Sequence, residues 1–203
     1  MRQTGPDSSP STGLRAATNR GHAVDWLYEE SEDRTARFVL GPTGENPLFC
    51  IGVNPSTAKP GNLDKTMATV QAVALRHGFD SFVMLNIYPF RSTDPNGLPR
   101  HFDSALDSLN QSHFAKALAN GDHAVWAAWG ALVKKRSYLV PALLDLLDLP
   151  ELANARWLCR GRLSKDGHPH HPLYVKGMEP LVPFEIRAYR DALRAAAAAK
   201  PLE

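Results

Sequence analysis

Two groups of polar residues in this chain follow apolar segments and have the side-chain types needed for chemistry on a polar substrate. The first group is Asn54-Pro55-Ser56, directly after the apolar run 48–53. The second is the histidine-rich segment 168–174, which reads His-Pro-His-His-Pro-Leu-Tyr. Because open α/β sheets bind ligands outside the carboxyl ends of their strands, we expect both groups to line one pocket.

The Asn54 side chain offers a donor and an acceptor, so it can orient a water molecule or hold the edge of a base. Pro55 fixes its own φ and biases Asn54 toward extended backbone, which aims that amide in advance. A turn through Ser56 can also direct backbone N–H groups at an anion. The alternative is an Asn-Pro-Ser turn that serves only the backbone, since such dipeptides are frequent in turns.

The three histidines between 168 and 171 do not have a metal-ligand spacing. No cysteine is nearby, and the one carboxylate close in sequence is Asp166. We therefore expect no metal, and no cofactor either, because the glycines form neither a P-loop nor a dinucleotide fingerprint. His171, stiffened by Pro172, is the better candidate, for stabilising an oxyanion or a phosphate. Ser56 with a histidine would suggest a hydrolase, although the Gly-x-Ser-x-Gly pattern is missing.

A second strand end carries further candidates. Asn86 stands in the apolar run 81–87, where a buried amide must be hydrogen-bonded or must face a ligand. Tyr88 and Phe90 follow and could stack on a base, while Arg91 could contact phosphate. The alternative is that these aromatic side chains form the edge of the core.

Backbone and charge point to three more positions. Gly130 ends the run 123–129 and can begin a helix near a ligand phosphate. Residues 156–176 contain five Lys and Arg residues against one Asp, with Arg160 and Arg162 just before the histidines. We expect these two arginines either to contact a polyanion or to form a solvated face.

The elements that must position these residues alternate along the chain. Strands are expected at 37–40, 48–53, 81–87, 123–129 and 156–163, and helices at 63–77, 103–119, 131–149 and 185–199. Asp64 is expected to cap the first helix, and Pro141 to interrupt the third. This order predicts an α/β fold, a three-layer α/β/α sandwich with a mainly parallel sheet of four or five strands.

Composition is that of an ordinary globular protein. The 203 residues are 43% hydrophobic and 22% charged. The net charge is +2, so the chain lacks the strongly basic character that would by itself indicate nucleic-acid binding. Residues 1–21 are expected to form a disordered tail before a single domain, 22–203. Cys50 and Cys159 stand in apolar strands and are read as small buried hydrophobes. Without a signal-peptide pattern or a membrane span, a cytoplasmic location is expected.

Several motifs together resemble a bacterial and phage domain-of-unknown-function family, over about residues 34–174. They are Ile51-Gly52-Val53-Asn54-Pro55-Ser56-Thr57-Ala58, Leu63-Asp64-Lys65-Thr66, Asn86-Ile87 with Thr93-Asp94-Pro95, Ala128-Trp129-Gly130, and His171-Pro172-Leu173-Tyr174. This family brings no known activity. Asp64, within the second motif, is counted among the substrate-binding candidates.

A more distant resemblance is to the uracil-DNA glycosylase superfamily. Its members have a Gly-x-Asn/Asp-Pro-type first motif, an Asn ending a middle strand, a Gly ending the next strand and a late His-Pro-Ser. The resemblance implies a glycosylase-like fold in which Asn54 positions a water, Asn86 reads a flipped base and His171 stabilises the departing base. Leu173 stands here where the superfamily has Ser.

The leading hypothesis is therefore an enzyme that cleaves an N-glycosidic bond in a nucleotide or nucleic acid. One alternative is a non-catalytic module that binds a nucleotide or nucleic acid. Another is a small hydrolase that uses Ser56 as its nucleophile.

Overall fold

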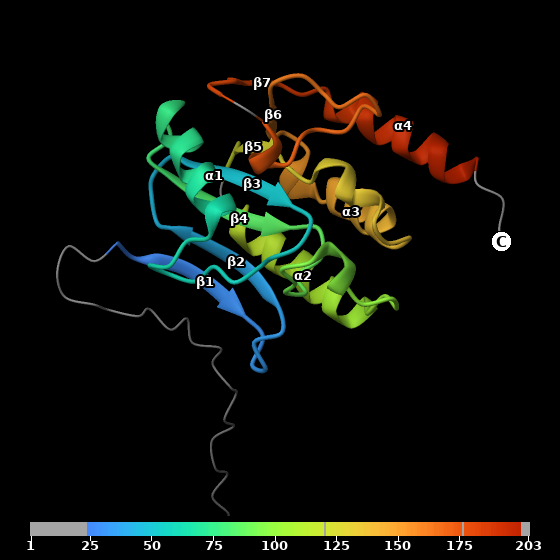
Figure 1. Cartoon of the computed structure of the whole chain (residues 1–203), viewed down its shortest axis with the longest axis horizontal. Helices are drawn as coiled ribbons and strands as arrows, with labels where there is room; N and C mark the ends of the chain where they lie inside the picture. Colours follow the sequence, from blue (N-terminus) through green and yellow to red (C-terminus); the bar gives the residue numbers. More distant parts are fainter. Residues whose placement is uncertain (1–23, 120, 176, 200–203) are drawn as a thin grey trace, which may run out of the picture.

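The computed structural model describes residues 24–199 except Asn120 and Lys176, and the predicted tail 1–21 lies outside the described residues. One seven-stranded sheet runs through the described part, in the order β1-β2-β4-β3-β5-β6-β7 (Figure 1). Its strands are β1 (Trp26–Glu30), β2 (Arg37–Pro42), β3 (Pro47–Gly52), β4 (Ser81–Asn86), β5 (Ala124–Ala127), β6 (Arg156–Arg160) and β7 (Leu181–Pro183).

The sheet is mixed and larger than the four or five strands expected. The four central strands, β4-β3-β5-β6, are parallel to one another. β1 and β2 continue the sheet antiparallel at one edge, and β7 does so at the other. β1 and β7 are short and only partly buried, so they lack the continuous apolar run that marks a central strand. A short connection between β1 and β2 also requires them to be antiparallel.

The helices begin and end at local features of the sequence. They are α1 (Lys65–Arg76), α2 (Ser104–Ala117), α3 (Leu139–Leu147) and α4 (Ile186–Ala198), with 3-10 turns η1 (Pro95–Gly97), η2 (Gly130–Lys134), η3 (Pro150–Leu152) and η4 (Pro172–Tyr174). Asp64 caps α1 as predicted, because its carboxylate accepts from the Met67 N–H at 2.9 Å. The expected helix 131–149 is divided into η2 and α3. Pro141 stands in the first turn of α3, where a missing N–H costs no helical hydrogen bond.

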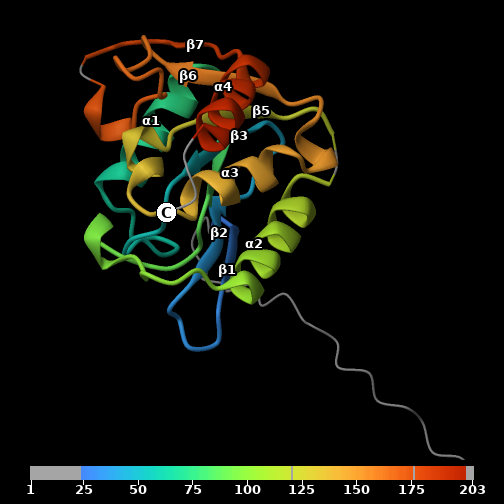
Figure 2. The ribbon, with the colours of Figure 1, turned by 90° about the vertical axis from the view of Figure 1, so that its right-hand side faces the viewer.

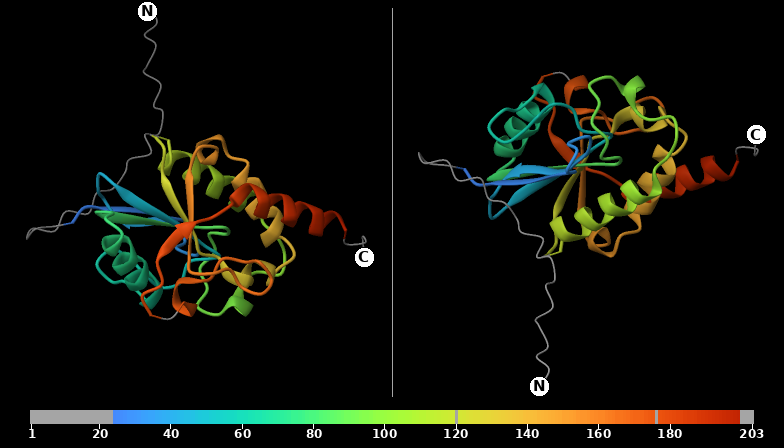
Figure 3. Two further views of the ribbon diagram at one scale, coloured as in Figure 1. Left: turned by 90° about the horizontal axis from the view of Figure 1, so that it is seen from above. Right: turned by 90° about the horizontal axis from the view of Figure 1, so that it is seen from below.

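Helices lie on both faces of the sheet. α1 covers one face, and α2, α3 and α4 cover the other (Figures 2 and 3). Alternate strand residues feed two cores: Cys50 and Met84 pack with α1, whereas Phe49 and Ile51 pack on the opposite side. Cys50 and Cys159 are free and buried, as predicted. No helix in the described part of the chain is long and apolar enough to cross a membrane.

Candidate functional site

A pocket of about 380 Å³ opens on the α1 side of the sheet, where β3 and β4 end. Its walls come from the loops after these two strands, from the start of α1 and from η2 and η4. The lining residues are Arg37, 52–54, Ser56, 64–67, Met84, Asn86, Ser92, Thr93, Leu132, His171, Leu173 and Tyr174. Five residues predicted for the site therefore line the same pocket: Asn54, Ser56, Asp64, Asn86 and His171.

Asn86 forms the buried floor of this pocket. It follows Phe82 and Met84 on the α1 face of β4 and pairs in register with Gly52 of β3. A Cβ on Gly52 would lie 2.7 Å from Met84 Cε and 3.2 Å from Asn86 Oδ1, so a side chain there would crowd the Asn86 amide. Asn86 is 0% exposed, and neither its Nδ2 nor its Oδ1 hydrogen-bonds to any described residue. An unpaired buried amide costs about 1–3 kcal/mol, which makes it an unusual feature for a native fold to keep.

Asn54 is fixed by two backbone carbonyls. Its Nδ2 donates to the Pro55 carbonyl at 3.0 Å and to the Ser92 carbonyl at 2.9 Å. These bonds use both amide protons, and Oδ1 remains as an acceptor. The Ser92 carbonyl belongs to the loop after β4, so the same side chain joins the two loops that form the pocket wall.

His171 presents a neutral imidazole to the pocket. Its Nδ1 accepts from the Leu173 N–H at 3.3 Å, which leaves the ring proton on Nε2. Burial lowers the pKa of His171 below its ordinary value, an effect that the charge of Asp64 opposes. At neutral pH the ring is therefore uncharged, with a free Nε2–H donor.

Gly130 supports His171 rather than lining the pocket. Its φ is +62°, and a Cβ there would lie 3.3 Å from the His171 backbone nitrogen. The left-handed conformation and the close approach both favour glycine at this position. Gly130 begins η2, a short 3-10 turn.

The other histidines have different surroundings. His168 is 2% exposed, and its Nδ1 lies 2.8 Å from the Tyr189 hydroxyl, which accepts from Trp129 Nε1 at 3.0 Å. Of the three histidines in the segment, His171 is the one that lines the pocket. In residues 24–199, apart from the two undescribed positions, no group of three or more His, Cys, Asp or Glu is arranged to hold a metal ion.

Arg37 is a pocket residue that sequence analysis did not identify. It is 2% exposed, and the one hydrogen bond that its side chain makes in the described structure is a long contact from Nη1 to the Ala58 carbonyl at 3.4 Å. It forms no ion pair with a described carboxylate, and its Nε has no partner there. Burial, followed by the charge of Arg91, lowers the pKa of Arg37 to about 10, so the guanidinium is still charged at neutral pH. The one sign in the sequence was a basic residue at the start of an apolar strand.

The profile of one family, described as a protein of unknown function, matches residues 37–173, about two thirds of the chain. The matched span includes every residue that lines the pocket except Tyr174. The chain belongs to the DUF1643 family. No curated protein and no solved structure matches it.

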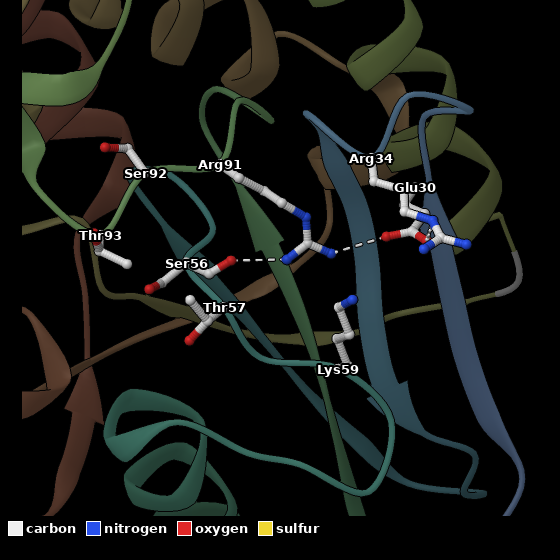
Figure 4. A pocket seen from close by; sticks show the side chains of 8 residues that line it. All are labelled: Glu30, Arg34, Ser56, Thr57, Lys59, Arg91, Ser92 and Thr93. Carbon is white, nitrogen blue, oxygen red and sulfur yellow. Dashed lines mark hydrogen bonds and ion pairs between the residues drawn. The ribbon is translucent and has the colours of Figure 1, made fainter.

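In this DUF1643 protein, Arg91 lines a neighbouring hollow of about 510 Å³ instead of the Asn54 pocket (Figure 4). Its Nη2 pairs with the Glu30 carboxylate at 3.1 Å and donates to the Tyr28 hydroxyl at 3.0 Å. Its Nη1 donates to the Ser56 carbonyl at 2.7 Å. The charge of Arg91 is thus neutralised within the protein, and the side chain holds the Asn-Pro-Ser turn in place.

Tyr88 lies in the core and not at the pocket. It is 0% exposed, and its hydroxyl accepts from the Asp103 N–H at 3.3 Å, so it offers no ring face to a ligand. The aromatic side chain that does line the pocket is Tyr174, exposed and with its ring centroid 5.3 Å from that of His171. The sequence indicated Tyr174 only as the last residue of the motif His171-Pro172-Leu173-Tyr174.

The basic stretch is divided between two environments. Arg160 is 4% exposed and donates to the backbone carbonyls of Glu179, Pro172 and Gly177. It therefore holds the chain that follows His171, and it does not line the Asn54 pocket. Arg162 is exposed and borders two other hollows of the DUF1643 protein.

Proposed function

We propose that the pocket binds the base of a nucleotide or nucleic acid, and that Asn54 and His171 promote hydrolysis of its N-glycosidic bond. The observation that carries this proposal is the fully buried amide of Asn86, which has no hydrogen-bond partner among the described residues. An amide presents a donor and an acceptor side by side, which matches the paired polar atoms on the edge of a base. A volume of about 380 Å³ is also within the range of small-ligand sites.

The reaction follows from the two fixed side chains. Asn54 Oδ1 accepts a hydrogen bond from a water molecule and directs its oxygen at the sugar C1′. The bond between C1′ and the base nitrogen breaks, and its electron pair leaves with the base. His171 Nε2–H donates to the negative charge that develops on the base.

The proton balance assigns Asn54 an orienting role. An amide is not a base, so the water attacks as the base departs, and its released proton ends on the base or in solvent. The products are the free base and a sugar with a hydroxyl at C1′. A neutral His171 suits this step because it donates a hydrogen bond to the leaving base while its Nδ1 keeps the contact with the Leu173 N–H.

The resemblance to the uracil-DNA glycosylase superfamily supports the proposal. Asn54, Asn86 and His171 occur in the order of the corresponding superfamily residues, and the resemblance assigns them the roles of water positioning, base reading and leaving-group stabilisation. A glycosylase-like α/β/α arrangement is part of the same proposal.

A binding module without chemistry is the second candidate. The observation that favours it is the pair of bonds from Asn54 to the Pro55 and Ser92 carbonyls, which give this residue a structural reason to be present. The Ser56 hydrolase has no such support, because the Ser56 hydroxyl makes no hydrogen bond to a histidine in the described structure.

The two candidates are separated by measuring released base. The protein is incubated with uracil-containing and mismatched oligonucleotides and with nucleoside monophosphates, and free base is quantified by chromatography. We expect His171→Ala to lower the rate roughly 10²–10³-fold, with Asn54→Ala also strongly impaired. His101→Ala and Asn62→Ala are the matched controls, because both residues are exposed and outside the pocket.

Binding of these probes without any release of base would favour the module. A protein that neither binds nor cleaves any of them would refute both candidates. Equal loss of activity in the pocket variants and their controls would refute the assigned roles.

A further inference from the structure

The guanidinium of Arg37 is a buried charge that forms no ion pair with a described carboxylate. Asp64, a carboxylate that lines the pocket, raises the pKa of Arg37 through its charge. It nevertheless forms no ion pair with Arg37, and its Oδ1 accepts from the Met67 N–H. The charge of the neighbouring Arg91 is neutralised by Glu30, although its Nε, like that of Arg37, has no described partner. The Arg37 side chain only shares the Ala58 carbonyl with Arg91, each at 3.4 Å. Burying a charge in this way is costly unless something in the pocket pairs with it.

We infer that Arg37 forms an anion subsite in the Asn54–His171 pocket, and that the ligand of this pocket carries a phosphate. This inference deepens the proposed function, since it makes the ligand a nucleotide instead of a base or nucleoside. The anion subsite itself rests on Arg37 and its surroundings, and the identity of the rest of the ligand rests on the proposed function.

The charges that line the pocket favour an anion. Arg37 and Lys65 are positive, Asp64 is negative, and His171 is neutral near pH 7. A phosphate monoester, with a charge of about −1.5 to −2 near neutral pH, would neutralise the excess. Lys65 also begins α1, and the N–H groups of a first helical turn lack partners within the helix.

The number of donors favours phosphate over a carboxylate. Three hydroxyl groups line the pocket and make no hydrogen bond to a described residue: those of Ser56, Thr66 and Thr93. Together with the guanidinium and the Lys65 ammonium, they offer more donors than the two oxygens of a carboxylate can use. A phosphate presents three terminal oxygens, and a planar guanidinium can bind two of them at once.

The experiment measures affinity by calorimetry for three matched probes: a nucleoside, its 5′-monophosphate and inorganic phosphate. A short oligonucleotide without terminal phosphates is the fourth probe, because the phosphate could belong to a free nucleotide or to a strand. The variants are Arg37→Met, which keeps the stem and removes the charge, and Arg100→Met, an exposed arginine outside the pocket.

We expect Arg37→Met to weaken the binding of the monophosphate, or of the oligonucleotide, about 10- to 100-fold. Nucleoside affinity should change less than threefold, and Arg100→Met should change nothing. The melting temperature of the empty protein should stay the same or rise in Arg37→Met, since an unpaired buried charge is removed. Arg37→Lys should recover part of the lost affinity.

The outcomes separate this inference from the proposed function. If the nucleoside binds and added phosphate brings no gain in wild type, the subsite is refuted and base binding stands. If inorganic phosphate binds in an Arg37-dependent way and no nucleoside or nucleotide binds better than phosphate alone, the subsite stands and the proposed function fails. If Arg37→Met weakens nucleoside and monophosphate equally, or folds poorly while wild type shows no phosphate binding, the inference is wrong.

Discussion

Replacing Asn86 by leucine should stabilise the empty protein while removing recognition of the ligand. Asn86 is 0% exposed, and both polar atoms of its side chain lack partners among the described residues. Leucine has the same branching and the same number of side-chain heavy atoms, and its bulkier methyl groups can extend into the pocket that Asn86 lines. The substitution therefore exchanges an unpaired amide for apolar atoms without opening a cavity. The backbone carbonyl of Asn86, which accepts from Asn110 Nδ2 at 3.0 Å, is left in place.

The expected gain follows from the cost of an unsatisfied buried polar group. That cost is about 1–3 kcal/mol, so the free energy of unfolding should rise by about this amount. For a chain of this size the melting temperature should rise by roughly 2–12 °C. Affinity for a base should fall about 5- to 150-fold, since one bidentate contact to a base edge contributes about 1–3 kcal/mol.

Asn110→Leu is the matched control, because Asn110 is equally buried but bonded. Its Nδ2 donates to the carbonyls of Asn86 and Ile87 at 3.0 and 3.2 Å. Its Oδ1 has no described partner, which offsets part of the loss. Removing the donor should nevertheless lower the free energy of unfolding by about 1–3 kcal/mol, opposite in sign to Asn86→Leu.

Urea denaturation of the two variants and the wild type, with and without ligand, measures both effects. If Asn86→Leu destabilises the protein as much as Asn110→Leu does, the Asn86 amide is satisfied in solution. The floor of the pocket would then be an ordinary polar core position, and the argument for a base-reading amide would fail.

Three further predictions concern the support of the site and the response to pH. Gly130→Ala and Gly61→Ala should each lower the free energy of unfolding by about 1–2 kcal/mol, because both glycines have positive φ. Only Gly130→Ala should also reduce base release, because its Cβ would contact the His171 backbone. Burial lowers the pKa of His171, so the unfolded chain takes up a proton first and the free energy of unfolding should fall as the pH drops below about 6.5. In urea denaturation between pH 7.5 and 5.5, His171→Ala should show less of this decrease. An unchanged dependence of the free energy of unfolding on pH would contradict the assignment. His113 lowers the pKa of Glu29 to about 2, so the stabilisation by this carboxylate should be complete above about pH 4.5 and disappear as the pH falls toward 2. In this pH range the free energy of unfolding of Glu29→Gln should depend less on pH than that of the wild type. Equal acid sensitivity of the two proteins would refute the role of Glu29.

Local patterns in the sequence accounted for the centre of the fold. The apolar runs that became β3, β4 and β5, and the cap at Asp64, are visible because burial and capping leave a signature within a few residues. The same patterns put Asn54 and Asn86 after neighbouring strands, and parallel strands bring their carboxyl ends to one edge. That part of the pocket could therefore be anticipated before any tertiary contact was known.

The edges of the sheet could not be anticipated in the same way. β1 and β7 have one neighbouring strand each and are only partly buried, so their sequences lack the continuous apolar run that identifies a central strand. β2 is apolar enough to be recognised, but its antiparallel pairing with β4 depends on the short connection, residues 43–46, that joins it to β3, the parallel neighbour of β4. Strand direction is a property of connections, which the apolar pattern does not report.

The sequence by itself indicated Asn54, Asn86 and His171 as candidates for the site, because their residue types and their neighbours along the chain are local features. Tertiary structure decided which charges are free to act. Arg91 was read as a phosphate contact, yet it pairs with Glu30, 61 residues away. Arg37, read only as the start of a strand, lines the pocket and forms no ion pair with a described carboxylate. Whether a buried charge is neutralised depends on partners that folding brings together from distant parts of the chain. Residue type and local sequence do not show which partners these are.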